Sequence, residues 1–173
     1  FSDLLSQVDE DLFISGVTCS SIISYISNIE KMLKKDCNIN ILISTTESLK
    51  SNVLISEGKY FDDNDKVMES ARSQRDILLK KFMTVEIIKT AFINEKLTIK
   101  ATNIPFTIAY VGVNVFSNSN KQKQLKVTQY IPGCKISDCP CMLINPTDNS
   151  EVYSFYEEYL KKSWNDAKPV EFT

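Results

Sequence analysis

The stretch Phe13-Ile-Ser-Gly-Val-Thr-Cys-Ser-Ser21 joins a short β-rich run to a helical pattern through a polar turn. Apolar residues then recur at helical spacing and predict a helix over about Ser20–Lys35. The near-continuous apolar run Asn40-Ile-Leu-Ile-Ser44 is typical of a strand buried on both faces. A strand over about Asp11–Val17, this helix and this second strand together predict a βαβ unit with a right-handed crossover.

Composition and charge exclude several classes of protein. The 173 residues are 43% hydrophobic and 24% charged, which fits a single globular domain over 1–173. A net charge of −2 argues against stable DNA binding, because non-specific binding needs a basic face. No apolar run reaches the roughly 18–20 residues that span a bilayer. The chain begins with Phe1, so we expect a soluble fragment of a longer chain whose missing N-terminal segment could anchor it.

The rest of the chain predicts further helices and strands. Residues 1–10 are polar with a few apolar positions and suggest a short helix. Helical patterns also cover about 48–57, where Gly58 would end the helix, and about 65–83. Residues 84–93 are ambiguous. Strand candidates follow, separated in one place by the polar hairpin-like loop 117–124: Leu97–Ala101, Phe106–Val115, Leu125–Ile131 and Met142–Ile144.

A capping box predicts the start of a final helix. In Asp148-Asn-Ser-Glu151 the first residue offers the side-chain acceptor and Glu151 follows three positions later. The helix should place an aromatic stripe toward the core or a dimer face, formed by Val152, Phe155, Tyr156, Tyr159 and Leu160.

Histidine is absent from the chain, and cysteine is present five times. The absence of His excludes Ser-His-Asp and Cys-His catalysis. An odd number of cysteines fits a reducing, cytosolic compartment better than a disulfide framework. A zinc site at Cys134, Cys139 and Cys141 would need a distant fourth ligand, so free cysteines are the simpler interpretation. The sequence does not assign these three thiols a role.

The turn after the first strand has two interpretations. Free N–H groups at a helix N-terminus, with the hydroxyls of Thr18, Ser20 and Ser21, suit a phosphate or a carboxylate. In a parallel α/β sheet this turn also lies at the edge where ligands usually bind. Ser and Thr are equally the preferred residues for plain helix capping. The sequence leaves both interpretations open.

Of the 20 basic residues, only Arg72 and Arg75 are arginine. Residues three apart share a helix face, and the planar guanidinium suits bidentate contacts with phosphate. The alternative is ion pairing within the helix, since Glu69 precedes Arg72 by three residues and Asp76 adjoins Arg75. Both interpretations remain open.

The order of these segments resembles one half of a phospholipase D-like domain. The resemblance covers most of the chain and is strongest in Leu12–Thr18, the helix through Lys35, the strand Ile39–Ser44, the helix with the two arginines, and Tyr153-x-x-Tyr156-x-x-Tyr159-x4-Trp164. The family is that of bacterial phospholipase D-like domains, often found behind transmembrane helices or beside DNA-binding regulators. The resemblance implies an α/β fold with a mixed sheet of about six or seven strands flanked by helices, and a homodimer about a two-fold axis.

Catalytic members of that superfamily carry His-x-Lys-x4-Asp on a strand near the middle of the sheet, and the His attacks phosphorus. The matching strand here is Ile104–Gly112, with Pro105 at the His position, Thr107 at the Lys position and Gly112 at the Asp position. None of the three is retained, and without any His the phosphohistidine mechanism cannot run, even across a dimer. The resemblance therefore implies a degenerate, non-catalytic member.

Such a member would be a sensor that binds a nucleotide or cyclic oligonucleotide and controls an attached effector, in the context of antiphage defence. It would lie on the cytoplasmic side, with the full-length protein tethered to the inner membrane. We expect no catalytic residue, metal or cofactor. The expected ligand site comprises Arg72, Arg75, Ser15, Thr18, Ser20, Ser21, Thr107 and Tyr110. The alternatives are a structural dimerisation module that uses the aromatic helix and, ranked last, a residual phosphodiesterase.

Overall fold

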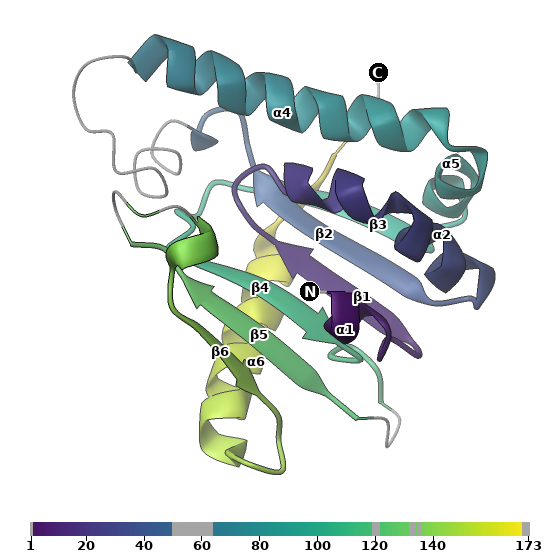
Figure 1. Ribbon diagram of the computed structural model, residues 1–173, viewed down its shortest axis with the longest axis vertical. Helices are drawn as coiled ribbons and strands as arrows, with labels where there is room; N and C mark the ends of the chain where they lie inside the picture. The colour runs from purple at the N-terminus through teal and green to yellow at the C-terminus, as the bar shows by residue number, and fades with distance from the viewer. Residues whose placement is uncertain (1, 50–63, 119–121, 132–133, 135, 171–173) are drawn as a thin grey trace.

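The computed structural model describes residues 2–49, 64–118, 122–131, 134 and 136–170, and these residues form an α/β fold on one mixed seven-stranded sheet (Figure 1). The strands are β1 (Asp11–Ser15), β2 (Asn38–Ser44), β3 (Leu97–Thr102), β4 (Ile108–Val113), β5 (Gln124–Gln129), β6 (Cys141–Ile144) and β7 (Lys168–Pro169). The helices are α1 (Ser2–Leu5), η1 (Ser20–Tyr25), α2 (Ile26–Lys34), α4 (Asn64–Thr84), α5 (Glu86–Ile93), η2 (Ile136–Asp138) and α6 (Ser150–Asp166).

The sheet joins a parallel half to an antiparallel half. Its strand order is β6-β5-β4-β1-β2-β3-β7. Strands β1 and β2 are parallel, which confirms the pairing predicted from the βαβ pattern, and β3 continues the parallel half, with Ile14 opposite Ile41 and Ile41 opposite Ile99. Strands β4, β5 and β6 form an antiparallel meander, and β4 runs antiparallel to β1. The strand predicted near the middle of the sheet therefore borders the central strand β1.

Helices cover both faces of the parallel half, and this explains its continuous apolar runs. Helices α2, α4 and α5 lie on one face and α6 crosses the other (Figure 1). Leu12 and Ile14 belong to the core under the first group, whereas Phe13 between them belongs to the core under α6. Because successive strand residues point to opposite faces, a strand covered on both faces needs apolar residues at every position.

The C-terminal end of α6 is fixed to the sheet by Trp164 and Lys100. The Trp164 ring packs edge-on against Phe13, with centroids 5.7 Å apart. Lys100 Nζ donates to the Trp164 carbonyl oxygen at 3.0 Å and lies 4.6 Å from the centre of the ring. A cation at a helix C-terminus also complements the helix dipole. The chain then returns to the sheet as β7, which pairs with β3.

The helix predicted over Ser20–Lys35 is two elements. A 3-10 helix, η1, precedes α2, and the residue before η1 is Cys19, whose φ of 52° lies in the left-handed region. The Cys19 side chain makes no capping hydrogen bond, and the contact nearest to the predicted capping is Thr18 Oγ1, which accepts from the Ser20 N–H at 3.5 Å. The left-handed residue turns the chain too sharply for a regular α-helix to begin there.

The final helix, α6, differs from the prediction in its capping residue and in which side chains it buries. Its cap is Asn149, not Asp148: the Asn149 side chain accepts from the Val152 N–H at 3.1 Å. Phe155 and Tyr159, predicted to face inward, are 66% and 41% exposed. The buried residues are Tyr153, Leu160, Ser163 and Trp164. Aromatic residues lie on both sides of this helix, so hydrophobicity alone does not fix its orientation, and the anchoring of Trp164 does.

The remaining predictions have mixed outcomes. The ambiguous segment 84–93 contains the helix α5, and neither η2 nor β7 was predicted. The predicted strand Phe106–Val115 is shorter, as β4. The helix predicted over 48–57 and its end at Gly58 lie almost wholly outside the described residues. Among the helices that the structure describes, none combines the length and the hydropathy needed to cross a bilayer.

Candidate functional site

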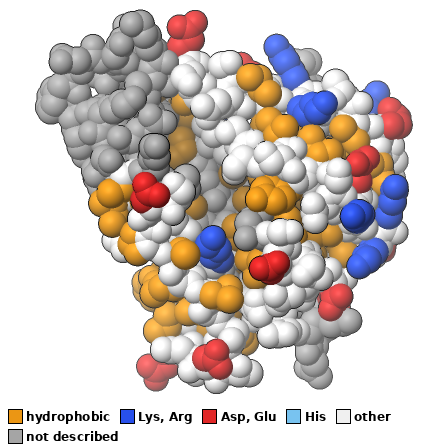
Figure 2. Space-filling model, viewed as in Figure 1, with side chains coloured by type: hydrophobic (Ala, Val, Ile, Leu, Met, Phe, Trp, Pro, Cys, Tyr) orange, Lys and Arg blue, Asp and Glu red, His pale blue; other side chains and the backbone are white. Residues whose placement is uncertain are grey.

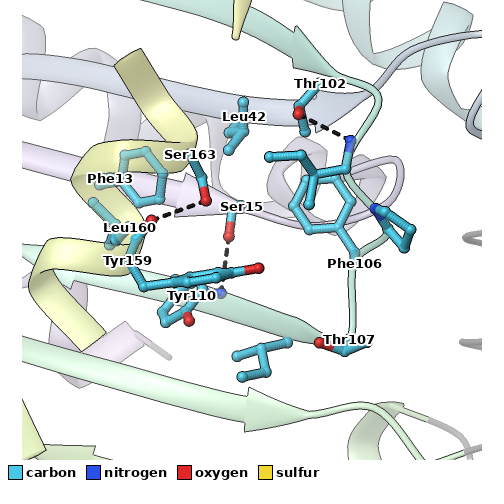
Figure 3. Close-up of a pocket in the computed structure, with 13 residues that line it drawn as sticks. Phe13, Ser15, Leu42, Thr102, Phe106, Thr107, Tyr110, Tyr159, Leu160 and Ser163 are labelled. Carbon is cyan, nitrogen blue, oxygen red and sulfur yellow. Dashed lines mark hydrogen bonds between the residues drawn. The ribbon is translucent and has the colours of Figure 1, made fainter. Parts of the chain in front are cut away.

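Two hollows lie near the carboxyl ends of the parallel strands, one on each face of the sheet. The first, which we call the β4 pocket, lies between β4 and α6 (Figure 3). It is lined by Phe13, Ser15, Leu42, Thr102, Ile104, Pro105, Phe106, Thr107, Ile108, Tyr110, Tyr159, Leu160 and Ser163. Its volume of about 20 Å³ has room for a water molecule and not for a nucleotide.

Ser15 and Tyr110 supply two of the polar groups that line the β4 pocket. The Tyr110 N–H donates to Ser15 Oγ at 3.1 Å, which fixes the hydroxyl at the end of β1 (Figure 3). The Tyr110 hydroxyl is buried and has no hydrogen-bond partner among the described residues. Burial, and then the neighbouring Tyr159 and Tyr156, raise the pKa of Tyr110. The hydroxyl therefore stays neutral at physiological pH and can still donate or accept.

Two of the three positions that the sequence resemblance assigns to the catalytic motif lie at this pocket. Pro105 and Thr107 line it beside Ser15. Gly112 lies further along β4, opposite Phe13. A Cβ atom on Gly112 would lie 2.6 Å from Val115 Cγ2, closer than real Cβ atoms approach other atoms. No side chain at position 112, aspartate included, fits without repacking the core.

The second hollow, which we call the α4 groove, lies between α4, the end of β2, and β7. The groove is open to solvent, and its volume of about 910 Å³ lies within the ~300–1,000 Å³ range of ligand pockets. Its cationic lining residues are Arg75, Lys80 and Lys168, and its hydroxyl residues are Ser44, Thr45, Thr46 and Thr84. Glu47 and Asp76 supply carboxylates, and Leu79, Met83 and Val170 supply apolar walls.

Arg75 is held in the α4 groove by two side-chain contacts. Its Nη1 donates to Thr46 Oγ1 at 2.9 Å, and its Nη2 lies 3.5 Å from Asp76 Oδ1. Its side chain is 17% exposed, and its Nε is buried with no partner in the described part of the chain. The ion pair with Asp76 bears out one part of the alternative interpretation of the arginines. Each Nη atom also carries a second N–H group, which leaves the guanidinium able to take a further acceptor.

The structure does not bring all eight predicted site residues together. Ser15, Thr107 and Tyr110 line the β4 pocket, whereas Arg75 lines the α4 groove on the opposite face. Arg72 is exposed on α4 and lines neither hollow.

Thr18 and Ser20 lie apart from both hollows, in the polar turn before η1. There Thr18 Oγ1 donates to Ser20 Oγ at 3.3 Å, and Ser20 Oγ donates to Gln74 Oε1 at 3.2 Å. The α4 side chain that hydrogen-bonds to the turn among the described residues is therefore Gln74 and neither arginine. Ser21 is exposed. A six-residue 3-10 helix also offers a weaker dipole to an anion than the α-helix that the sequence predicted.

The cysteines are free thiols. Burial raises the pKa of the Cys19 thiol to about 12, so this thiol in the polar turn is not a nucleophile at neutral pH. Cys139 is buried before β6, Cys134 is half-buried, and Cys141 is exposed at the start of β6. Within the described ranges no group of three or more Cys, Asp or Glu side chains is arranged to hold a metal ion.

Some residues of the α4 groove were not predicted as site residues. Thr45 and Thr46 directly follow β2, and this position at the carboxyl end of a parallel strand could have identified them. Lys80 carries no such signal, and Lys168 reaches the groove only because β7 pairs with β3 at the far edge.

Comparison with known proteins supports the fold alone. The sequence matches no family model and no curated protein. The structure resembles the phosphatidylserine synthase of Haemophilus influenzae Rd KW20, with a TM-score of 0.58 at 12% identity. That enzyme is a member of the phospholipase D superfamily. The likeness covers 97% of this chain and 35% of the synthase, so the chain spans about a third of that enzyme's length. The chain therefore has a phospholipase D-like α/β fold.

Proposed function

We propose that this domain binds a phosphate-bearing ligand of the nucleotide class, such as a nucleotide or cyclic oligonucleotide, without cleaving it. The observation that carries the proposal is the α4 groove, which gathers Arg75, Lys80 and Lys168 around a volume large enough for such a ligand. The three cations exceed the two carboxylates of the lining, Glu47 and Asp76, so the groove favours an anion.

Arg75 is the proposed phosphate anchor. The bond to Thr46 holds the guanidinium in one orientation, so little side-chain entropy is lost when a ligand binds. The exposed Asp76 carboxylate competes only weakly for Arg75 at 3.5 Å, because a half-exposed ion pair contributes little. A phosphate diester could therefore displace it and gain charge-assisted hydrogen bonds.

We further propose that the domain is a degenerate, non-catalytic member of the bacterial phospholipase D-like family. The chain has no His, and Pro105, Thr107 and Gly112 stand at the catalytic positions of the overlay. The steric block at Gly112 and the small volume of the β4 pocket support this proposal. The proposed biological role follows from the resemblance: control of an attached effector in antiphage defence, tethered at the cytoplasmic side of the inner membrane.

Calorimetric titration with cyclic dinucleotides and cyclic trinucleotides tests the ligand proposal. Arg75→Ala should weaken binding roughly 10- to 100-fold, since a hydrogen bond to a charged group is worth about 1.5–3 kcal/mol. Lys81→Ala is the matched control, because Lys81 is exposed on the same helix and does not line the groove. Arg72→Ala tests whether the second arginine also contributes. Equal affinities of Arg75→Ala and wild type would remove the site assignment.

A second candidate function is a structural dimerisation module. Phe155 and Tyr159 are exposed on α6, and Ile104, which lines the β4 pocket, is exposed as well. Such side chains are common at protein interfaces. A dimer by sedimentation, with no nucleotide raising the melting temperature, would favour this role over ligand binding. Turnover of any phosphodiester, with or without divalent metals, would instead indicate a residual enzyme.

A further inference from the structure

The outer strand β6 ends the sheet with an open backbone edge. The Gln129 N–H donates to the Pro140 carbonyl at 3.1 Å, and the antiparallel register with β5 then runs from Cys141 to Ile144. Hydrogen-bonded and non-hydrogen-bonded pairs alternate along such a ladder. The backbone groups of Met142 and Ile144 therefore face β5, and the N–H and C=O groups of Cys141 and Leu143 point away from the sheet. Among the described residues no other strand pairs with this outer edge of β6.

The side chains of β6 do nothing to protect this edge. Leu143 is 61% exposed and Met142 is 48% exposed, on opposite faces of the strand. Hydrophobic side chains gather around this part of the sheet at the lower left of the molecule (Figure 2). The segment 139–147 contains no charged residue. Proteins usually guard a free edge with a charge, a bulge or a covering element, because an unguarded edge pairs with another strand.

We propose that β6 pairs with β6 of a second copy of this chain, antiparallel about a two-fold axis at Met142. In this register Cys141 lies opposite the partner's Leu143, so every outward N–H and C=O of the two residues gains a backbone partner. A neutral strand placed against its own copy meets no like charge, and a two-fold pairing consumes both open edges at once. The inference deepens the proposed homodimer by locating its interface, and it makes one sheet continuous across two chains.

The register can be tested by a disulfide across the axis. Opposed residues of a non-hydrogen-bonded pair have Cα atoms about 4.5 Å apart, within the roughly 4.4–6.8 Å of disulfides. Met142→Cys in a Cys141→Ser background should form a covalent dimer under mild oxidation, seen on a non-reducing gel. Ile93→Cys in the same background is the matched control, because Ile93 is 69% exposed on α5, at a distance from β6 in the fold.

A charge placed on the edge should separate the copies. Leu143→Lys should raise the dimer dissociation constant roughly tenfold or more in sedimentation equilibrium, because it removes apolar burial and sets a cation in the seam. Ile93→Lys should leave the constant unchanged, and circular dichroism checks that both variants are folded. If wild type is a dimer but Met142→Cys cross-links no better than Ile93→Cys, the dimer stands and the β6 interface is wrong. If wild type is a monomer at all accessible concentrations, the homodimer and its β6 interface are both wrong.

Discussion

Replacement of Gly112 by alanine tests how closely the core is packed around β4. The added Cβ would lie 2.6 Å from Val115 Cγ2, 3.1 Å from Leu125 Cδ2 and 3.5 Å from Phe13 Cβ. All three neighbours are fully buried, so none can move into solvent. The backbone of Gly112 is not in the left-handed region, so the variant measures this steric conflict without added backbone strain.

The expected cost of Gly112→Ala follows from two opposing effects. Overpacking of a core costs about 1–3 kcal/mol. Replacing glycine in a strand returns roughly 0.5–1 kcal/mol, because the unfolded chain loses freedom. The variant should therefore be less stable by about 1–2 kcal/mol. For a urea m-value of about 2 kcal/mol/M, the unfolding midpoint should fall by roughly 0.5–1 M.

A double-mutant cycle with Val115→Ala locates the conflict. Val115→Ala removes the atom 2.6 Å from the new Cβ, so Gly112→Ala should cost less in that background, with a coupling of about 1 kcal/mol or more. Equal stability of Gly112→Ala and wild type would refute the packing argument. A cost that is unchanged in the Val115→Ala background would place the conflict elsewhere. The same contact predicts a larger loss for Gly112→Asp, which adds a buried carboxylate.

Two further predictions concern stability. Burial raises the folded-state pKa of Asp11 above its ordinary value of 3.8, against opposing hydrogen bonds from the backbone of Phe116, Ser117 and Val115. The folded state therefore binds the Asp11 proton more tightly than the unfolded state does, and the wild-type free energy of unfolding should rise as pH falls from the raised pKa toward 3.8. Asp11→Asn should remove this contribution to the pH dependence, as measured by urea titrations at several pH values. Asn149→Ala should cost about 1 kcal/mol by loss of the helix cap, and Asp148→Ala should cost clearly less in thermal melts; the reverse order would restore Asp148 as the cap.

The sequence predicted the parallel half of the sheet well because its signals are local. Strands β1 and β2 contain compact apolar runs, and β3 is marked by the alternation of Leu97, Ile99 and Ala101 with polar residues. The meander β4, β5 and β6 was found with errors of a few residues at its ends. Turn residues mark where a strand stops only approximately.

The candidate site was less predictable because its parts come from distant segments. Arg75 stood out by its rarity, but its position on α4 relative to the sheet depends on packing that no local pattern encodes. Lys168 enters the α4 groove only through the pairing of β7 with β3. The polar turn gave a misleading signal, because the left-handed Cys19 replaced the expected α-helix start with a 3-10 helix.

The antiparallel contact between β1 and β4 has a consequence for synthesis on the ribosome. The N–H of Tyr110 reaches Ser15 across 95 residues of sequence, whereas β2 follows β1 almost at once. At about 5–20 residues per second, β1 emerges roughly 5–20 s before its second neighbour exists. During that interval an apolar strand keeps one edge unpaired, and chaperones that hold extended apolar segments should engage the nascent chain there until β4 arrives.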